Sequence, residues 1–281
     1  MTSLENTTSG DHTLGIDGNM ILDDMLGSIL WEGKIPIIFQ LSENEITSNQ
    51  RPNPCFVLAS RLSYLPMVAS DAITYLQNSV LQYTSMIWFE YNHYPLKANL
   101  PLGVLFDMTT ENSNNNKLPW IVTIHFQSFP FNQIVNCSTL KDSERYYNHS
   151  LKQALYLLHG NTNAFNSLTI ECKQSVWNSV CTGDYNTFQQ VSRDLISTTS
   201  TIKKLPIKFI KLGYPTVQIN IDTTRVILLK DVIDKLDDHD MNSRLLVHGI
   251  DISCHLNVPI YDIWKLFYHG DLFMYIIIST K

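Results

Sequence analysis

The chain has 281 residues, a formal net charge of −6 and 44% hydrophobic residues, which favours about two folded domains with packed cores. The acidic balance argues against a nucleic-acid-binding protein, because phosphate contacts need clustered Lys and Arg, and it weakens any strong attachment to anionic membranes. Five cysteines without a regular spacing favour free thiols in a reducing, cytoplasmic compartment.

The N-terminal region divides into a polar tail and a short helix. Residues 1–19 are rich in Gly, Thr and Ser, so we expect a disordered tail without a signal peptide. Across residues 20–31, apolar side chains recur at helical spacing, which predicts a short amphipathic helix that Gly27 weakens. No apolar run in the chain reaches the roughly 20 residues that span a bilayer.

Strand-forming residues dominate the region after this helix. We expect strands at residues 35–41 and 55–65, a helix capped by Ser70 that runs to residue 82, and strands at 87–91 and 120–126. The polar residues 109–117 predict a flexible loop before the last strand. Strand, strand, helix, strand, strand is the order of a β-grasp, the ubiquitin-like fold, which we assign to residues 32–135.

Helical periodicity characterises the middle of the chain, residues 140–200. Between residues 142 and 159, five apolar side chains form one stripe, namely Tyr147, Leu151, Ala154, Leu155 and Leu158. Gly160 and Asn161 are expected to end this helix. Two further helices are predicted around residues 165–176 and 185–195, followed by a linker at 197–201. These elements predict a helix-rich domain.

Residues 203–281 repeat the earlier order of elements. Strands are expected at 205–212 and 217–221, a helix at 228–236, an extended segment at 244–247, a short helix at 259–268 and a closing strand at 272–279. The two copies share no visible sequence period. The predicted fold is therefore α+β, with two ubiquitin-like β-grasp domains flanking the helix-rich domain and a short N-terminal helix at residues 20–31.

The most distinctive motif lies at residues 86–107. It contains Trp-Phe-Glu at 88–90, Pro-Leu-Lys at 95–97 and Pro-Leu-Gly-Val-Leu-Phe-Asp at 101–107. Other motifs occupy matching places along the chain: Trp-Glu-Gly-Lys-Ile-Pro at 31–36, Arg-Leu-Ser-Tyr-Leu at 61–65, Leu-Pro-Trp at 118–120, His-Phe-Gln-Ser-Phe-Pro at 125–130, His-Gly-Ile at 248–250 and Phe-Met-Tyr-Ile-Ile-Ile at 273–278. Over residues 20–281 the chain thereby resembles the autophagy protein 5 family.

The resemblance implies a non-enzymatic scaffold for autophagosome formation. Members of this family accept the ubiquitin-like modifier autophagy protein 12 on a lysine and bind a helix of the coiled-coil partner autophagy protein 16. The assembled complex acts in the manner of an E3 ligase and promotes lipidation of autophagy protein 8 with phosphatidylethanolamine. The implied partners include the E2-like autophagy proteins 3 and 10. The resemblance also implies a cytoplasmic protein that is recruited peripherally to phagophore membranes.

Lys152 is the candidate acceptor, because residues 152–160 look like the acceptor segment of the family. Four residues are predicted to fall on or near the face opposite the apolar stripe: Arg145, His149, Lys152 and Tyr156. The lysine should therefore be exposed on a rigid support. Since a free lysine amine is largely protonated at neutral pH, activation would have to come from the thioester of the conjugating enzyme. The alternative is an ordinary solvated helix lysine.

The N-terminal helix and the residues after it are the second candidate site. In the family, this helix and both ubiquitin-like domains hold the helix of autophagy protein 16. The corresponding residues here are Leu26, Leu30, Trp31, Glu32 and Gly33. The alternative is that the helix packs only on its own sheet.

Other residue patterns favour structural roles or less specific functions. The aromatic residues Trp88, Phe89 and Phe106 suit a core, whereas Glu90 and Asp107 suit surface recognition or loop capping. The adjacent pair at 254–255, Cys-His, suggests a thiol enzyme, but neighbours on an extended chain point to opposite faces. No Cys/His cluster has metal-ligand spacing, so we expect neither a metal nor another cofactor. The rival function is a binding scaffold that holds the modifier non-covalently and is never conjugated.

Overall fold

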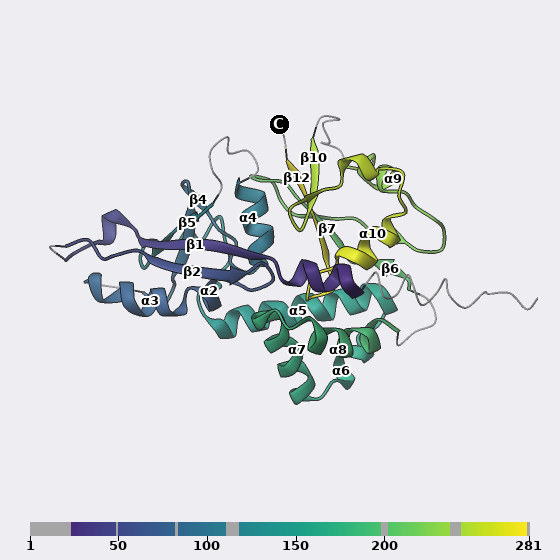
Figure 1. Cartoon of the computed structure of the whole chain (residues 1–281), viewed down its shortest axis with the longest axis horizontal. Coiled ribbons are helices and arrows are strands. Elements are labelled where there is room, and N and C mark those ends of the chain that lie inside the picture. The colour runs from purple at the N-terminus through teal and green to yellow at the C-terminus, as the bar shows by residue number, and fades with distance from the viewer. Residues whose placement is uncertain are drawn as a thin grey trace, which may run out of the picture.

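The computed structural model describes residues 24–48, 50–81, 84–110, 118–197, 202–236 and 243–279. It contains two five-stranded sheets and a layer of helices that lies below both of them (Figure 1). The predicted tail at 1–19, the first part of the predicted helix at 20–23, most of the predicted loop at 109–117 and most of the linker at 197–201 lie outside the described residues.

The first sheet forms because alternating side chains on its strands bury one face. Its strands are β1 (Lys34–Leu41), β2 (Cys55–Ser60), β3 (Trp88–Tyr91), β4 (Tyr94–Pro95) and β5 (Trp120–His125). Their order is β2-β1-β5-β3-β4, with β1 and β5 parallel and every other pair antiparallel. On β1, residues 35, 37, 39 and 41 are buried and the residues between them are not. This is the β-grasp arrangement that the order of elements predicts.

Short helices accompany the first sheet: η1 (Glu43–Glu45), α2 (Leu65–Val68), α3 (Ser70–Leu76) and η2 (Gln77–Ser79). The predicted strand at 55–65 is wrong in its second half. It ends at Ser60, because Pro66 stands in the first turn of α2, where proline favours a helix start. The cap predicted at Ser70 is also wrong, since Ala69 is the N-cap and no side chain caps α3.

Two elements of this part lacked a sequence prediction. Strand β4 follows a turn at Asn92 and His93, whose φ angles are 47° and 64°, and the turn has none of the glycines that usually mark such geometry. Helix α4 (Leu102–Thr110) is buried at nearly every position. A helix that is buried all round has no polar face, so its sequence shows no helical period. Because α4 extends to Thr110, the loop predicted from residue 109 begins too early.

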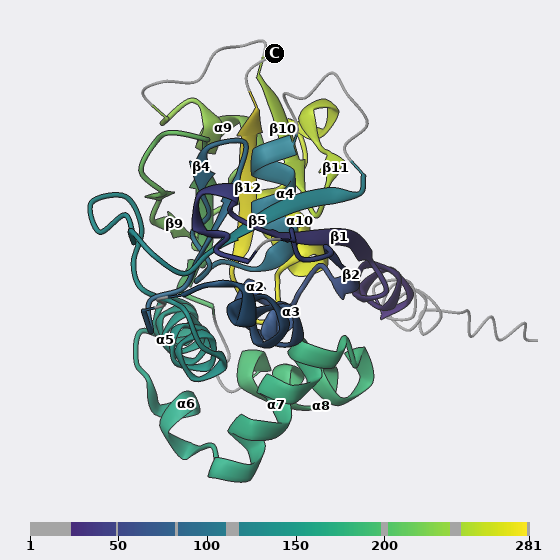
Figure 2. The same ribbon diagram turned by 90° about the vertical axis from the view of Figure 1, so that its left-hand side faces the viewer.

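The helical layer consists of α5 (Leu140–His159), α6 (Asn163–Ser167), α7 (Ile170–Thr182) and α8 (Tyr185–Ser197). Helix α5 begins with a capping box between Thr139 and Asp142 and ends at Gly160, which has a φ of 74°. The helix predicted at 165–176 is instead split between α6 and α7, because Thr169 is extended and caps the start of α7. In Figure 2 these helices lie beneath the strands of both sheets.

The second sheet contains β7 (Ile207–Ile210), β8 (Val217–Gln218), β10 (Arg244–Val247), β11 (Ile250–Asp251) and β12 (Met274–Ser279). Its order is β11-β10-β12-β7-β8, and β7 and β12 are parallel. Read from β8 to β11, with β7, β8, β10, β11 and β12 taken as the first to fifth strands, this is the order of the first sheet. The strands predicted at 205–212 and 217–221 are interrupted, because β6 (Lys204–Leu205) and β9 (Ile221–Asp222) pair separately. The remaining elements are α9 (Leu229–Ile233), η3 (Ser253–His255) and α10 (Ile260–Phe267).

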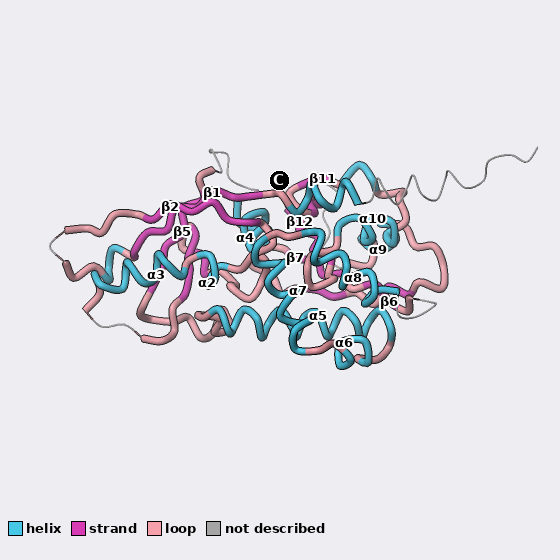
Figure 3. The backbone as a smooth tube through the Cα atoms, turned by 60° about the horizontal axis from the view of Figure 1, so that its bottom comes forward, coloured by secondary structure: helices cyan, strands magenta, loops and turns pink. Residues whose placement is uncertain are grey.

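The two sheets meet across α4, which lies between the two groups of strands (Figure 3). Within this junction Arg61 forms a buried ion pair with Asp107. The backbone N–H of Gly213 donates to the Tyr94 hydroxyl over 3.0 Å, and the Tyr147 hydroxyl of α5 donates to the Gly270 carbonyl over 2.9 Å. The last two bonds connect the part of the chain that forms the second sheet to the first sheet and to the helical layer. Among the described residues, no helix combines the length and apolar character required to cross a membrane.

Candidate acceptor helix and partner groove

The outward face of α5 is the first candidate site. Tyr147, Leu151, Ala154, Leu155 and Leu158 are all buried, which confirms the predicted stripe. Arg145, His149, Lys152 and Tyr156 are exposed on the other side of the same helix. Because the stripe fixes the helix against the rest of the protein, the Lys152 amine is presented on a rigid support.

The surroundings of Lys152 combine a half-buried aromatic ring with the edge of the second sheet. The Lys152 Nζ lies 5.9 Å from the centre of the Phe165 ring, and the Lys173 Nζ lies 4.6 Å from the same centre. The next residue, Gln153, donates from Nε2 to Oε1 of Gln218 on β8 over 3.3 Å. Within the described part of the chain, Lys152 has no ion-pair partner. Its amine is therefore accessible to a large incoming reagent.

The N-terminal helix, described over residues 24–31, is attached to α8 by its C-terminal residue and by its first described residue. The Trp31 ring is 5% exposed and packs 4.5 Å from Phe188 and 5.7 Å from Tyr185, measured between ring centres. Asp24 pairs with Arg193 of α8. Gly27 permits this close approach, because a Cβ there would lie 2.2 Å from the Tyr185 hydroxyl oxygen.

The five residues proposed to bind a partner helix are therefore not equally accessible. Leu26 is 39% exposed and Glu32 is exposed, whereas Leu30 and Gly33 are half-buried and Trp31 is buried. Trp31 can support the helix from behind, but its ring already packs within this chain. The same helix also exposes Met25 and Ile29, at 57% and 61%. Their apolar helical spacing was visible in the sequence, but the burial that separates them from Trp31 was not.

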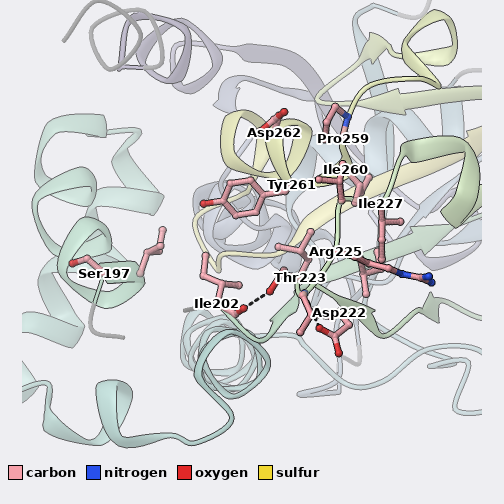
Figure 4. A pocket seen from close by; sticks show the side chains of 15 residues that line it. Ser197, Ile202, Asp222, Thr223, Arg225, Ile227, Pro259, Ile260, Tyr261 and Asp262 are labelled. Carbon is pink, nitrogen blue, oxygen red and sulfur yellow. Dashed lines mark hydrogen bonds between the residues drawn. The ribbon is translucent and has the colours of Figure 1, made fainter. Parts of the chain in front are cut away.

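Two hollows adjoin α10, whose residues line both of them. A small one lies between the N-terminal helix, α8 and α10, next to Leu30, Lys265 and Leu266. A larger groove of about 680 Å³ continues at the other end of α10, between the end of α8 and the strands β6 and β9. Figure 4 shows Tyr261 extending from α10 over this groove toward the end of α8 at Ser197. Sequence analysis missed the groove, because its walls come from segments far apart in the chain.

The apolar lining of the larger groove includes Ile196, Ile202, Leu205, Ile221, Val226, Ile227 and Ile260. Arg225, Asp222 and Asp262 provide charges at its rim. An apolar floor with a charged rim suits an amphipathic helix, whose apolar stripe would enter the groove while its polar face remains in water.

The remaining sequence candidates have structural roles. Phe89 and Phe106 are buried, and Trp88 stacks on His125 with ring centres 3.8 Å apart. Glu90 binds the His125 Nε2 over 3.2 Å. Asp107 is 5% exposed, so the suggestion of a surface recognition group is wrong for this residue.

The thiols give little support to a thiol enzyme. Burial raises the pKa of Cys137 to about 11 and that of Cys181 to about 12, so both thiols are protonated near neutral pH. Cys254 and His255 lie in the short turn η3, and Cys254 is exposed. In the described ranges no three His, Cys, Asp or Glu side chains converge as metal ligands would.

Two sheets with the same β-grasp strand order, joined by a helical layer, define the class of the protein as an α+β protein with ubiquitin-like domains. The family model described as "Autophagy protein ATG5, UblA domain" matches residues 30–126. The model described as "Autophagy protein ATG5, alpha-helical bundle region" matches residues 140–198. Together they cover more than half of the chain. The chain belongs to the autophagy protein 5 family.

Individual relatives agree with this assignment. The chain is 29% identical to autophagy protein 5 of Debaryomyces hansenii, over 89% of this chain and 93% of that protein. It is 32% identical to autophagy protein 5 of Arabidopsis thaliana, over 59% of this chain and 48% of the relative. The crystal structure of Kluyveromyces marxianus Atg5 has the same fold, with a TM-score of 0.78 at 23% identity, covering 91% of this chain and all of the other. The protein is thus an autophagy protein with a ubiquitin-like fold.

Proposed function

We propose that this protein is the lysine acceptor for the ubiquitin-like modifier autophagy protein 12, and that Lys152 forms the isopeptide bond. The observation that carries this proposal is the exposed amine on a helix whose opposite face is completely buried. A thioester of the modifier, formed on the E2-like autophagy protein 10, would be attacked by the Lys152 amine, and the enzyme thiol would leave. The acceptor then needs only access and rigid positioning, which α5 provides.

The second part of the proposal is that autophagy protein 16 binds along the N-terminal helix and α10. Its apolar stripe would contact Leu26 and Leu30 on the N-terminal helix and would continue toward Tyr261 over the larger groove. Trp31 would hold the N-terminal helix in place from behind, and Glu32 and Gly33 would fix the chain where β1 begins. The acceptor amine and the partner helix would then occupy separate surfaces.

With both partners bound, the complex would act in the manner of an E3 ligase. It would position the E2-like autophagy protein 3 and so promote transfer of autophagy protein 8 to phosphatidylethanolamine on phagophore membranes. In this proposal the protein has no catalytic residue, acts in the cytoplasm and reaches the membrane through its partners. The proposed domains are residues 32–135, 140–200 and 203–281, preceded by the helix at 20–31.

The acceptor is tested by reconstituting conjugation with the purified modifier and its activating and conjugating enzymes. Lys152→Arg should abolish the heavier band on a denaturing, reducing gel, because arginine keeps the charge but not the acceptor amine. Lys173→Arg is the matched control, since Lys173 contacts the same Phe165 ring and should be dispensable. Undiminished conjugation of Lys152→Arg would refute the assignment, and the absence of any covalent product from the wild type would favour the non-covalent scaffold.

Partner binding is tested by placing charges on the exposed side of the N-terminal helix. The double substitution Leu26→Glu with Ile29→Glu leaves the buried Trp31 in place and should weaken binding of the autophagy protein 16 helix by about a hundredfold. Ile170→Glu, at an 80% exposed position of α7, is the control and should bind normally. Calorimetry measures the affinities, and unchanged affinity of the double variant would exclude this surface.

A further inference from the structure

The outer edge of β2 is an exposed sheet edge that the functions proposed above do not use. β2 is the last strand of its sheet and pairs only with β1. On this strand Phe56 is 74% exposed and Leu58 is 63% exposed. An edge strand with large apolar side chains invites pairing with another strand, and natural proteins usually protect such edges with charges, prolines or bulges. Within Cys55–Ser60 there is neither a charged residue nor a proline.

The hydrogen-bond phase of the β1–β2 ladder shows where the main-chain groups of these two residues point. Arg61 N–H donates to the carbonyl of Gly33, the residue opposite it, over 3.0 Å, so this rung is hydrogen-bonded. The rung of Ala59 and Ile35 lies two residues further along each strand and is therefore hydrogen-bonded as well. Hydrogen-bonded and non-bonded rungs alternate in an antiparallel ladder, so the rung of Leu58 and its partner Pro36 is non-bonded. Pro36 has no N–H to give, which agrees with this phase.

Phe56 lies on the next non-bonded rung, opposite Ile38. Both Phe56 and Leu58 therefore direct their N–H and carbonyl groups away from β1, toward the open edge. No other described segment forms a backbone hydrogen bond with these groups. Two pairs of main-chain donors and acceptors thus lie along the edge at the spacing that an added β-strand requires, next to two exposed apolar side chains.

The outer face of the sheet extends this apolar strip inward. Ile38 is half-buried, and its neighbour on β5, Ile121, is 46% exposed. Phe56, Ile38 and Ile121 therefore form one apolar rung across three strands. Side chains of an added strand that point to this face would pack against Phe56 and Leu58, whereas its alternate side chains would point to the other face.

Charge and sterics define one end of the edge. Lys34 is exposed on the rung opposite Ser60, and within the described residues it has no ion-pair partner. Neighbouring strands are about 4.8 Å apart, so the long Lys34 side chain can reach over Ser60 to a strand added there. The turn between α7 and α8 bounds this end, since a Cβ on Gly183 would lie 3.6 Å from the Ser60 Oγ. An added segment would therefore be short and would meet a cation where it ends.

We propose that the open edge of β2 binds an extended segment of a partner protein, with apolar residues at alternate positions and an acidic residue at the end near Lys34. The segment would add a sixth strand to the first sheet. Its main chain would bond to Phe56 and Leu58, its apolar side chains would cover their exposed rings and methyl groups, and its carboxylate would pair with Lys34. This surface is separate from the Lys152 face and from the groove beside α10.

The probes are two fluorescent decapeptides in which Ile and Thr alternate, with two Asp residues at the amino end of one and at the carboxyl end of the other. Saturable anisotropy with at least one of them is the expected result. Each peptide is also made with N-methyl groups on alternate residues, in two complementary sets. One set should abolish binding and the other should leave it nearly unchanged, because only alternate N–H groups of an added strand face the edge.

Protein variants locate the binding. Leu58→Pro removes an outward N–H without touching the bonds to β1, and it should lower affinity about tenfold or more, whereas Leu58→Thr should cost less. Val217→Thr on β8, the equivalent edge of the second sheet, should leave affinity unchanged. Absence of saturable binding by both peptides, equal effects of both N-methyl sets, or a dimer of this chain that Leu58→Pro disrupts would each overturn the proposal.

Discussion

The two β-grasp sheets share one strand order but differ in what surrounds them. In the first sheet the edge strand β2 has six residues, its neighbour β1 has eight, and the edge is open. In the second, β7 and β8 have four and two residues, and Gln218 on the edge is bonded to Gln153 of α5. The same topology can therefore serve either as an accessible surface or as an internal support.

The second sheet also contains buried ionisable groups. Asp271 is 1% exposed and accepts a bond from the Tyr275 hydroxyl over 2.5 Å, and burial raises its pKa. Lys208 lies with its Nζ 3.7 Å from the centre of the Phe273 ring, and burial lowers its pKa. His269 stacks on His248 with ring centres 3.9 Å apart. Such groups need fixed surroundings, so this sheet should tolerate less rearrangement than the first.

The largest expected effect comes from removing one buried ring in each sheet. Phe39→Ala on β1 and Phe209→Ala on β7 should each lower the free energy of unfolding by about 4 kcal/mol, because each leaves a cavity on a strand next to the central strand of its sheet. Phe131→Ala, at a 70% exposed position, is the control and should have little effect. Urea unfolding followed by circular dichroism measures the three values.

The same experiment tests whether the sheets unfold together. Since α4 packs against β12 of the second sheet, we expect one cooperative transition for both phenylalanine variants. Two separate transitions, with only one of them shifted in each variant, would show that the sheets are independent.

The next effect concerns the ion pair at the junction. Asp107→Ala should destabilise the protein by about 3 kcal/mol, because it leaves the Arg61 guanidinium buried without its carboxylate. The double substitution Arg61→Met with Asp107→Leu removes both charges and should recover most of this loss. Chemical denaturation of Arg61→Met, Asp107→Leu and the double variant measures the coupling energy, and an additive double variant would contradict the pairing.

Acid pH should weaken the second sheet through its stacked histidines. Burial lowers the pKa of His248 to about 3 and that of His269 well below its usual value, and Arg61 adds to both shifts. Between the unfolded pKa near 6.5 and these low folded values, the unfolded chain binds protons that the folded protein does not. Stability should therefore fall with decreasing pH, by up to about 1.4 kcal/mol per pH unit for each histidine.

His269→Phe isolates this effect, because phenylalanine retains a ring against His248 and Tyr275 and cannot titrate. Above pH 6.5 the unfolding free energies of the wild type and this variant should change with pH in parallel. Below pH 6.5 the unfolding free energy of the wild type should fall more steeply than that of the variant. Parallel pH profiles of the two proteins from pH 7 to pH 5 would contradict the assignment.

The smallest effect is expected from the single hydrogen bond that joins Gly213 to Tyr94 of β4. Tyr94→Phe removes the acceptor of the Gly213 N–H and should cost about 1 kcal/mol or less, since this amide is exposed and water can replace the hydroxyl. A small decrease in melting temperature is the expected readout. A loss as large as that of Asp107→Ala would contradict the minor role of this contact.

Periodic patterns identified the regular elements of the fold. The stripe on α5 and the alternation on β1 gave the correct type, and the predicted exposure of Lys152 followed from the same periodicity. Helix α4 could not be found in this way, because its burial between two sheets removes the polar face that marks a helix. Strand β4 after the turn at Asn92 was not predicted, because two residues are too few to show an alternating pattern.

The candidate sites show a similar division. The family resemblance selected Lys152 and the helix face predicted its exposure, whereas the larger groove depends on tertiary contacts between α8, α10, β6 and β9. The burial of Trp31 against Phe188 also joins residues that are far apart in the sequence. No local pattern contains the distance between such segments, so sequence analysis placed Trp31 beside Leu26 as if the two were equally accessible.

The most direct measurement is tandem mass spectrometry of the conjugate with autophagy protein 12, digested with trypsin. We expect a branched peptide in which the C-terminal residues of the modifier are joined to the Nζ of Lys152, with no cleavage after that lysine. A branch on Lys173, Lys141 or any other lysine, with an unmodified Lys152, would contradict the proposal that the outward face of α5 is the acceptor site.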